Sequence, residues 1–302
     1  MLDRTDYYRS REDIAGAMYP RNEPVVHGSG KAGGLLNSQQ IKNYERDGFL
    51  WLDRFFPQHM ISSFLEELDV MAQDRHFCER EEVVMDSNRE RIRSVFAMHE
   101  ISSAFDELTR DPLLLDMVQQ LLGGDVYIHQ SRINSKSGFS GNGFEWHSDF
   151  ETWHSEDGMP EMRAISASIM LTENTPFNGP LMLIPGSHEY FIPCAGTTPD
   201  NNWEQSLKQQ TVGLPPQQAV STLAQKHGIK APTGPAGSLL LFECNTLHAS
   251  NRNMSPWPRA NLFFVYNSVD NRLVQPFART PRRPHYLAAR DRTEALTPHH
   301  RA

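Results

Sequence analysis

Two histidines and one aspartate are spaced so that they could share one metal ion. His147 and Asp149 are separated by a single residue, and His248 follows about 100 residues later. Residues i and i+2 of an extended segment point to the same side of the chain, so the first imidazole and the carboxylate can meet one cation. An isolated His-x-Asp is more often a hydrogen-bonded pair, so this interpretation depends on His248 as a third ligand.

Two histidines and one carboxylate leave about three coordination positions open on an octahedral ion. This ligand set suits non-haem Fe(II), which has to hold a co-substrate and O2 at the same time. Zinc is the competing metal, and because zinc has no redox chemistry it would indicate a hydrolase. The sequence has no His-Glu-x-x-His motif that would favour a zinc protease.

A cation and a hydroxyl follow the second histidine at short spacing. Ser250 lies two residues after His248, and Arg259 lies eleven residues after it. A guanidinium binds a carboxylate through two parallel hydrogen bonds, and a nearby hydroxyl adds a third. This pair fits the distal carboxylate of 2-oxoglutarate when the keto-acid end of that molecule chelates iron.

Four polar residues alternate along a segment that has the composition of a strand. Gln130, Arg132, Asn134 and Lys136 share one face of this segment, which begins near Val126. Such a face either meets water or lines a pocket. In a pocket, Lys136 would pair with a co-substrate carboxylate and Gln130 would hydrogen-bond a small polar substrate.

The elements that must position these residues differ between the two halves of the chain. Residues 1–36 are polar and glycine-rich and are expected to form a flexible leader. Residues 37–122 are expected to be helical: Asn37 or Ser38 can cap a first helix that ends at Gly48. A later helix is expected to begin at Asp111-Pro112 and to end at Gly123-Gly124.

From residue 126 the apolar pattern changes to a period of two, which predicts strands. The expected strands are Val126 to Asn134, Arg163 to Leu171, Pro180 to Ile184, Ser238 to Phe242 and Leu262 to Tyr266. Many strands with turns after a helical first third predict a mainly β fold, a double-sheet jelly roll with flanking helices. The β core is placed at 126–270 within one catalytic domain over 37–302. Residues 211–237 are expected to form a surface loop and 271–302 a surface tail.

Charge and cysteine content exclude several classes of protein. The net charge of −8 argues against nucleic acid as a partner, because phosphate binding needs a basic face. No apolar run is long enough to span a bilayer, so no membrane association is expected. Cys78, Cys194 and Cys244 are few and widely spaced, which is typical of a cytoplasmic protein without disulfides.

The segment around the first histidine is much more specific than His-x-Asp alone. Residues 144–160 read FEWHSDFETWHSEDGMP, and Met162-Arg163-Ala164, residues 178–182 (NGPLM) and residues 185–188 (PGSH) follow. This pattern resembles the signature of ectoine hydroxylases, a branch of the phytanoyl-CoA dioxygenase-like 2-oxoglutarate enzymes. The resemblance covers roughly residues 38–270.

The resemblance implies a double-stranded β-helix, which is the cupin-like jelly roll, and a complete set of site residues. Fe(II) would be bound by His147, Asp149 and His248, and 2-oxoglutarate by Lys136, Ser250 and Arg259. Ectoine would be surrounded by Gln130, Thr152, Trp153, Ser166, Phe242 and Phe263. The implied reaction consumes O2 and 2-oxoglutarate, converts ectoine to 5-hydroxyectoine and releases succinate and CO2. Related enzymes are often dimeric, so a homodimer is expected.

Two alternatives stay open at this point. A hydroxylase of another small amino acid or osmolyte would keep the iron and 2-oxoglutarate residues and change the pocket. A non-catalytic jelly roll that senses a metabolite would bind a ligand without consuming 2-oxoglutarate. The intact His, Asp, His and Arg set speaks against the second alternative.

Overall fold

A seven-stranded antiparallel sheet forms the centre of the computed structural model, which describes residues 6–13, 15–28, 34–86, 90–139, 143–207 and 210–299. In spatial order its strands are β2 (Phe49–Leu52), β10 (Leu239–Glu243), β7 (Ala164–Met170), β12 (Arg259–Ser268), β5 (Val126–Lys136), β4 (Ile92–Phe96) and β3 (Val83–Met85). The five strands expected from the sequence correspond to β5, β7, β8, β10 and β12, with bounds shifted by a few residues.

A second, three-stranded sheet faces the large one. Its order is β6 (Phe144–His147), β11 (His248–Ser250) and β8 (Leu181–Leu183). A separate two-stranded sheet pairs β1 (Tyr19–Pro20) with β9 (Tyr190–Phe191), which is far from it in the sequence. Phe242 and Phe263 of the large sheet belong to one apolar cluster with Leu181 and Leu183 of the small sheet. The two sheets therefore enclose a common interior, as expected for a double-sheet fold.

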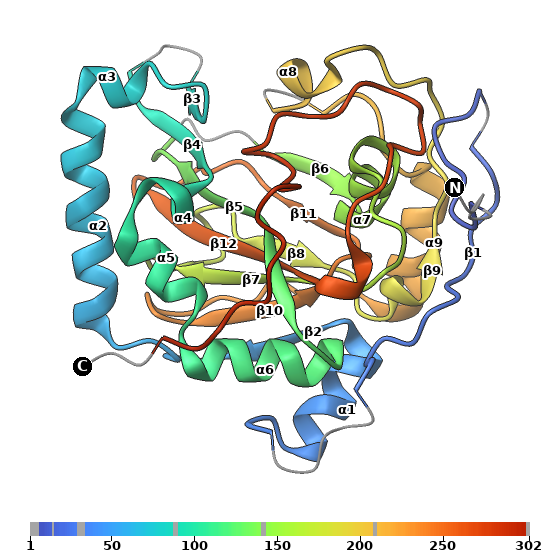
Figure 1. Ribbon diagram of the computed structural model, residues 1–302, viewed down its shortest axis with the longest axis horizontal. Helices are drawn as coiled ribbons and strands as arrows, with labels where there is room; N and C mark the ends of the chain where they lie inside the picture. The colour runs from blue at the N-terminus through green and yellow to red at the C-terminus, as the bar shows by residue number, and fades with distance from the viewer. Residues whose placement is uncertain are drawn as a thin grey trace.

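Helices from the first half of the chain cover the other face of the large sheet. The helices in chain order are α1 (Ser38–Asp47), α2 (Gln58–Gln73), α3 (Arg75–Cys78), α4 (Met98–Ile101), α5 (Ser103–Thr109), α6 (Pro112–Leu122), α7 (Asp149–Thr152), η1 (Trp153–Asp157), η2 (Ser187–Glu189), α8 (Asn202–Ser206), α9 (Gln217–His227) and η3 (Val269–Asn271). In Figure 1, α2 runs along the left edge and α6 lies below the large sheet, and the buried faces of both belong to the same core as that sheet. Among the described residues, no helix is long and apolar enough to cross a membrane.

Alternation along the strands divides their side chains between these two interiors. On β10, Leu239 and Leu241 join the core beneath the helices, whereas Leu240 and Phe242 join the cluster between the sheets. All four are fully or almost fully buried. Burial of each such side chain contributes about 1.5–3 kcal/mol relative to exposure, so both faces of the sheet stabilise the fold.

A β-bulge in β5 turns its polar residues toward the interior between the sheets. Tyr266 pairs with Ile128, but Val265 pairs with Gln130, so His129 is an extra residue without a partner on β12. Because side chains alternate with a period of two, the extra residue reverses which face the following residues occupy. Ile128 therefore lies in the helix-side core, while Gln130 lies opposite Val265 on the other face.

The first half of the chain confirms the two helix caps and corrects the expectation of an all-helical segment. Asn37 caps α1 and Asp111 caps α6, and both helices end at a glycine in the left-handed conformation, as predicted. The same segment also contributes β2, β3 and β4 to the large sheet. The short apolar run Phe49–Leu52 is a strand because it pairs with β10 of that sheet. The spacing of apolar residues in a short run does not distinguish a helix from a strand.

Three other segments differ from expectation. The expected surface loop at 211–237 contains α9, which begins after Pro216 and buries Leu223. The expected leader contributes buried Tyr8 and Arg11, although its residues 1–5, 14 and 29–33 lie outside the described part. The expected surface tail contributes a buried run at 286–289 and passes in front of β5 (Figure 1). These segments take their positions because they pack against the rest of the fold. A local sequence pattern does not reveal such long-range packing.

Candidate active site

Three side chains meet at one edge of the small sheet. His147 is the last residue of β6, His248 is the first residue of β11, and the two are direct register partners with ring centroids 4.2 Å apart. Asp149 is the first residue of α7, where Ser148 is the N-cap, so the carboxylate comes from a helix start and not from a continued strand. The candidate ligand atoms of these three residues all lie within 4.8 Å of one another.

Backbone carbonyls fix the orientation of both imidazoles. Nδ1 of His147 donates to the carbonyl of Glu145 (2.7 Å), and Nδ1 of His248 donates to the carbonyl of Thr246 (3.0 Å). These bonds leave each Nε2 free, at 3.7 Å and 3.8 Å from the carboxylate oxygens of Asp149. Hydrogen bonding of the second ring nitrogen is the usual support of a metal-binding histidine.

The protonation states also suit a metal ion. Burial, with a smaller contribution from His248, lowers the pKa of His147 to about 4, and burial also lowers the pKa of His248. Burial acts to raise the pKa of Asp149, but His248 and Arg132 outweigh it, so that pKa is lowered. Two neutral imidazoles and one ionised carboxylate are the forms that bind metals.

One oxygen of the aspartate supports the same conclusion. Oδ2 of Asp149 is buried and has no hydrogen-bond partner among the described residues. An unpaired buried carboxylate oxygen is costly unless an ion or ligand satisfies it. The three residues therefore fit a divalent cation, and the two-histidine, one-carboxylate set suits Fe(II) with open positions for co-substrate and O2.

A pair of buried cations lies on the neighbouring strands. Lys136 and Arg259 are register partners on β5 and β12 and are only 3% and 2% exposed. Nζ of Lys136 donates to Oγ of Ser250 (2.8 Å) and to the carbonyl of Asn251 (2.6 Å), while Nη1 of Arg259 donates to the carbonyl of Gly179 (2.6 Å). In the described part of the chain neither cation pairs with a carboxylate, so the pair can receive one from a ligand.

Burial changes the acidity of both groups. Burial, followed by the charges of Arg259 and Arg93, lowers the pKa of Lys136 to about 6. Burial lowers the pKa of Arg259 to about 10. An anionic ligand would reverse these shifts, because it favours the charged form of each group.

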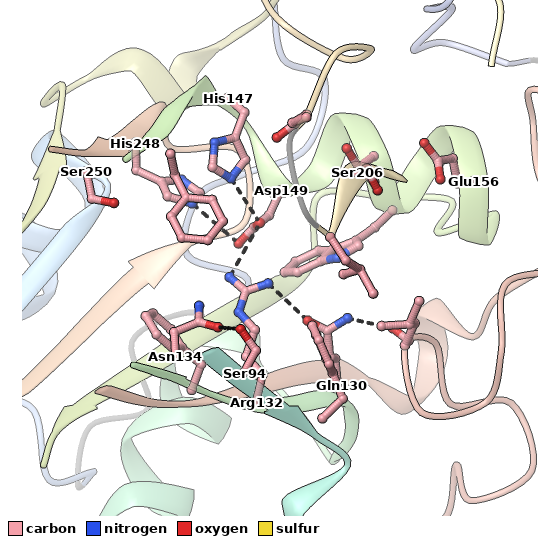
Figure 2. A pocket seen from close by; sticks show the side chains of 18 of the residues that line it. Ser94, Gln130, Arg132, Asn134, His147, Asp149, Glu156, Ser206, His248 and Ser250 are labelled. Atoms are coloured by element: carbon pink, nitrogen blue, oxygen red, sulfur yellow. Dashed lines mark hydrogen bonds and ion pairs between the residues drawn. The ribbon is translucent and has the colours of Figure 1, made fainter. Parts of the chain in front are cut away.

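A pocket joins the metal ligands to the rest of the predicted site. Its lining includes four of the residues predicted to contact the substrate: Gln130, Thr152, Trp153 and Phe263. The lining also includes Ser250 and Arg259. Figure 2 shows Ser250 and Glu156 on opposite sides of Asp149 in that view, so we refer to a co-substrate end and a substrate end of the pocket.

Two predicted substrate residues do not line this pocket. Phe242 is fully buried behind the metal ligands, with its ring 5.1 Å from the ring of His248. Ser166 is fully buried on β7, beside Phe242 and Val265 on the neighbouring strands. At these positions Phe242 packs directly on the metal ligand His248, and Ser166 packs beside Phe242. The hydroxyl of Ser166 makes no hydrogen bond among the described residues.

Arg132 is a site residue whose face was predicted from the alternating pattern of the strand, whereas its role was not. Its guanidinium donates to Oε1 of Gln130 (3.1 Å) and lies 3.9 Å from Asp149 (Figure 2). It also lies over the ring of Phe263, 5.0 Å from the ring centroid. It therefore connects a metal ligand to two predicted substrate residues. Alternation with Gln130 and Lys136 was the signal that could have identified it.

The last part of the chain adds a wall that no sequence pattern indicated. Leu287 lines the pocket, and its carbonyl accepts from Nε2 of Gln130 (2.7 Å). Arg283 also lines it and binds Asp157 through two hydrogen bonds of 2.7 Å and 2.5 Å. Both residues stand in a proline- and arginine-rich stretch without periodicity.

Comparison with known proteins agrees with this geometry. Residues 44–261 match the phytanoyl-CoA dioxygenase (PhyH) family. An ectoine dioxygenase of Bordetella parapertussis is 47% identical over 97% of this chain and 95% of its own length. An ectoine dioxygenase of Halomonas elongata is 52% identical over 89% of this chain and 80% of its own length. The chain belongs to the ectoine dioxygenases of the PhyH family.

Solved structures confirm the family and the fold. EctD from S. alaskensis with 2-oxoglutarate and 5-hydroxyectoine is 41% identical, with a TM-score of 0.87 and coverage of 97% of this chain and 98% of that one. The same TM-score relates this chain to EctD from S. alaskensis with bound Fe. The predicted jelly roll with flanking helices is therefore confirmed.

Proposed function

We propose that this chain hydroxylates ectoine to 5-hydroxyectoine, using Fe(II), 2-oxoglutarate and O2 and releasing succinate and CO2. The observation that supports it most strongly is the metal triad beside a buried cation pair, in a chain whose relatives at 47% and 52% identity are ectoine dioxygenases. The three metal ligands leave coordination positions open, and among the described residues the two buried cations have no carboxylate partner. Together they fit a dicarboxylate that chelates the metal through its other end.

In this proposal His147, Asp149 and His248 hold Fe(II). When bound, the iron supplies the oxidative chemistry that couples decarboxylation of 2-oxoglutarate to insertion of one oxygen atom into the substrate. Ser250 and the pair of Lys136 and Arg259 bind the distal carboxylate of 2-oxoglutarate. Their position across the two sheets sets the distance between that carboxylate and the iron ligands.

The substrate end of the pocket orients ectoine, which is a small cyclic amidine with a carboxylate. Delocalised cations pack well on aromatic faces, and Trp153 and Phe263 supply two such faces. Gln130 and Thr152 offer hydrogen bonds that fix the orientation of the ring. Orientation decides which C–H bond faces the iron, and a misplacement of 1 Å can cost about 100-fold in rate.

A turnover assay tests the proposal. Purified protein is incubated with Fe(II), 2-oxoglutarate, O2 and ectoine, and the products are measured by mass spectrometry. We expect a product heavier by one oxygen atom, together with an equal amount of succinate. Succinate without hydroxylated ectoine would indicate a hydroxylase of another substrate, and iron binding without succinate would indicate a sensor.

We further infer a cytoplasmic homodimer. The inference rests on the family and on three free cysteines in the described part of the chain. Light scattering after size-exclusion chromatography is expected to give twice the chain mass of 34.5 kDa. A monomer mass at micromolar concentration would contradict the dimer, and disulfide-linked protein from cell extracts would contradict the location.

A further inference from the structure

One guanidinium from the N-terminal segment contacts side chains that line the substrate end of the pocket. Arg11 is 6% exposed and has a left-handed backbone conformation with φ of 64°. It lies far from the pocket in sequence, and its own segment is held by a backbone hydrogen bond to the carbonyl of Cys194 (2.9 Å). Left-handed backbone in a non-glycine residue is uncommon, so the surrounding contacts must hold this arginine in place.

The contacts of Arg11 connect two consecutive helical elements. Nε and Nη2 bind the two oxygens of Glu151 at 2.6 Å and 2.8 Å, which is a bidentate pair on α7. Nη1 binds Glu156 of η1 at 3.1 Å and the hydroxyl of Thr198 at 3.1 Å. Nη2 also lies 3.3 Å from the hydroxyl of Thr152. A single planar group thus ties three points of α7 and η1 to the N-terminal segment.

These points alternate with residues of the site itself. Glu151 lies two residues after Asp149 and directly before Thr152 and Trp153, which line the pocket. Glu156 lines the pocket as well, and its second partner is Nδ2 of Asn202 at 2.9 Å. Any movement of α7 and η1 would therefore move the substrate-facing residues.

A glycine closes this ion pair on its remaining side. A Cβ atom on Gly213 would lie 2.4 Å from Nη2 of Arg11 and 2.7 Å from Oε2 of Glu151. Gly213 has φ of +76°, and its neighbour Val212 lines the pocket. A side chain at this position would press directly on the ion pair of Arg11 and Glu151, whose side chains are each 1% exposed.

We propose that Arg11 is a positioning residue for the substrate: it holds α7 and η1 so that Thr152 and Trp153 face ectoine. The role rests on the proposed hydroxylase function but concerns a residue outside the region of resemblance used to assign the site. Arg11 forms ion pairs with two buried carboxylates, Glu151 and Glu156, and so offsets part of their mutual repulsion.

Among the described residues, Arg11 makes no hydrogen bond or ion pair with the co-substrate end of the pocket. Lys136, Ser250 and Arg259 come from β5, β11 and β12, and the metal-binding His147 and His248 come from β6 and β11. The third metal ligand, Asp149, begins α7, but the start of this helix is held without Arg11: Ser148 donates to Asn245 (2.9 Å), and the amide of Phe150 donates to the carbonyl of Cys244 (2.9 Å). Removal of Arg11 should therefore affect ectoine far more than 2-oxoglutarate. A merely structural role would weaken both ligands together, so this difference separates the two interpretations.

The test compares Arg11→Met with Arg9→Met, an exposed arginine two residues away. We expect Arg11→Met to raise KM for ectoine by roughly 10- to 100-fold and to form more than one succinate per hydroxyectoine, because the substrate is misplaced. KM for 2-oxoglutarate should stay within about twofold. Arg9→Met should behave as the wild-type protein. An unchanged KM for ectoine, or an equal rise for both ligands, would overturn the proposal.

Two further variants cover the case in which Arg11→Met does not fold. Arg11→Lys keeps the charge but not the planar fork, so it should fold and still raise KM for ectoine. Gly213→Ala disturbs the same ion pair from the opposite side and should give the same selective effect. Wild-type values for ectoine in both variants would contradict the role of Arg11.

Hydrogen exchange gives a readout that does not depend on the identity of the substrate. In Arg11→Lys, amides of residues 151–157 should exchange faster, whereas those of β5 and β12 should not. If the wild-type protein did not hydroxylate ectoine, the proposed function would fail, but this exchange pattern would still support or contradict the positioning role. Equal protection of residues 151–157 in the two proteins would contradict it.

Discussion

Lys136 and Arg259 stand directly opposite each other on β5 and β12, and both are buried. Like charges at paired positions of a sheet are destabilising, and burial adds the cost of desolvation. The protein reduces this cost by lowering the pKa of Lys136 to about 6, with burial as the largest cause. The pair is thus better suited to a bound dicarboxylate than to an empty pocket.

Binding of 2-oxoglutarate should be accompanied by proton uptake at Lys136. In the free protein this group is neutral above about pH 6, and a carboxylate beside it restores the charged form. The pKa rises on binding, so affinity is highest below pH 6 and falls by up to about tenfold per pH unit above it. Calorimetry at pH 7.5 in two buffers of different ionisation enthalpy should detect close to one proton taken up.

Lys136→Arg is the control for this prediction. A guanidinium stays protonated throughout this pH range, so the variant should bind 2-oxoglutarate without proton uptake. Equal heats in both buffers for the wild-type protein would show that Lys136 is already charged in the empty pocket.

Asp149→Ala should abolish hydroxylation and the stabilisation of the protein by metal. The change removes the carboxylate ligand, whose Oδ2 has no hydrogen-bond partner among the described residues and whose Oδ1 lies 3.9 Å from Arg132. Metal at 100 times its dissociation constant should raise the free energy of unfolding of the wild-type protein by about 2.7 kcal/mol, and it should raise that of the variant hardly at all. Thermal unfolding with and without Fe(II) under argon measures both effects. Retained turnover at the wild-type rate would exclude Asp149 as a ligand.

Arg132→Met should reduce kcat/KM for ectoine by roughly 10- to 100-fold. The change removes a hydrogen bond to Gln130 and the stacking on Phe263, and bonds to charged groups contribute about 1.5–3 kcal/mol. Steady-state kinetics at saturating 2-oxoglutarate measures the loss. Arg132→Lys keeps the charge without the planar surface and should recover only part of the activity. Full activity of Arg132→Met would show that the Arg132 guanidinium has no role in binding or orienting ectoine.

Arg283→Met should lower the free energy of unfolding by about 3–5 kcal/mol, because it leaves the fully buried carboxylate of Asp157 without its bidentate partner. Urea denaturation monitored by circular dichroism tests this. Arg282→Met, a change at the exposed neighbour, should stay within about 0.5 kcal/mol. Adding Asp157→Asn to Arg283→Met should recover part of the loss, and a failure to recover any would point to packing instead of charge.

Local signals predicted those parts of the fold that local chemistry determines. Asn37 and Asp111 cap helices because their side chains accept from the first backbone amides, and this pattern is visible in the sequence. The alternation of Gln130, Arg132 and Lys136 likewise predicted a shared face. The three metal ligands were predicted from the spacing of His147 and Asp149 together with one distant histidine, His248.

The remaining parts depend on pairing and packing that no single segment specifies. The bulge at His129 exists only in the register between β5 and β12, so alternation alone does not reveal where the polar face begins. Arg11 and Arg283 lie in segments without periodicity, and each binds a carboxylate of α7 or η1 from more than 100 residues away in sequence, with separations of 140 and 126. Only the folded arrangement shows that both belong to the substrate end.

The C-terminal wall makes the two ends of the pocket depend on different parts of the chain. Leu287 and Arg283 complete the substrate end, and the amide of Ala289 donates to the carbonyl of His129 (2.9 Å). The three candidate metal ligands, His147, Asp149 and His248, all precede this segment in the sequence. A proteolytic cut between residues 272 and 282 would therefore leave the metal ligands together on the larger fragment and separate the wall from them.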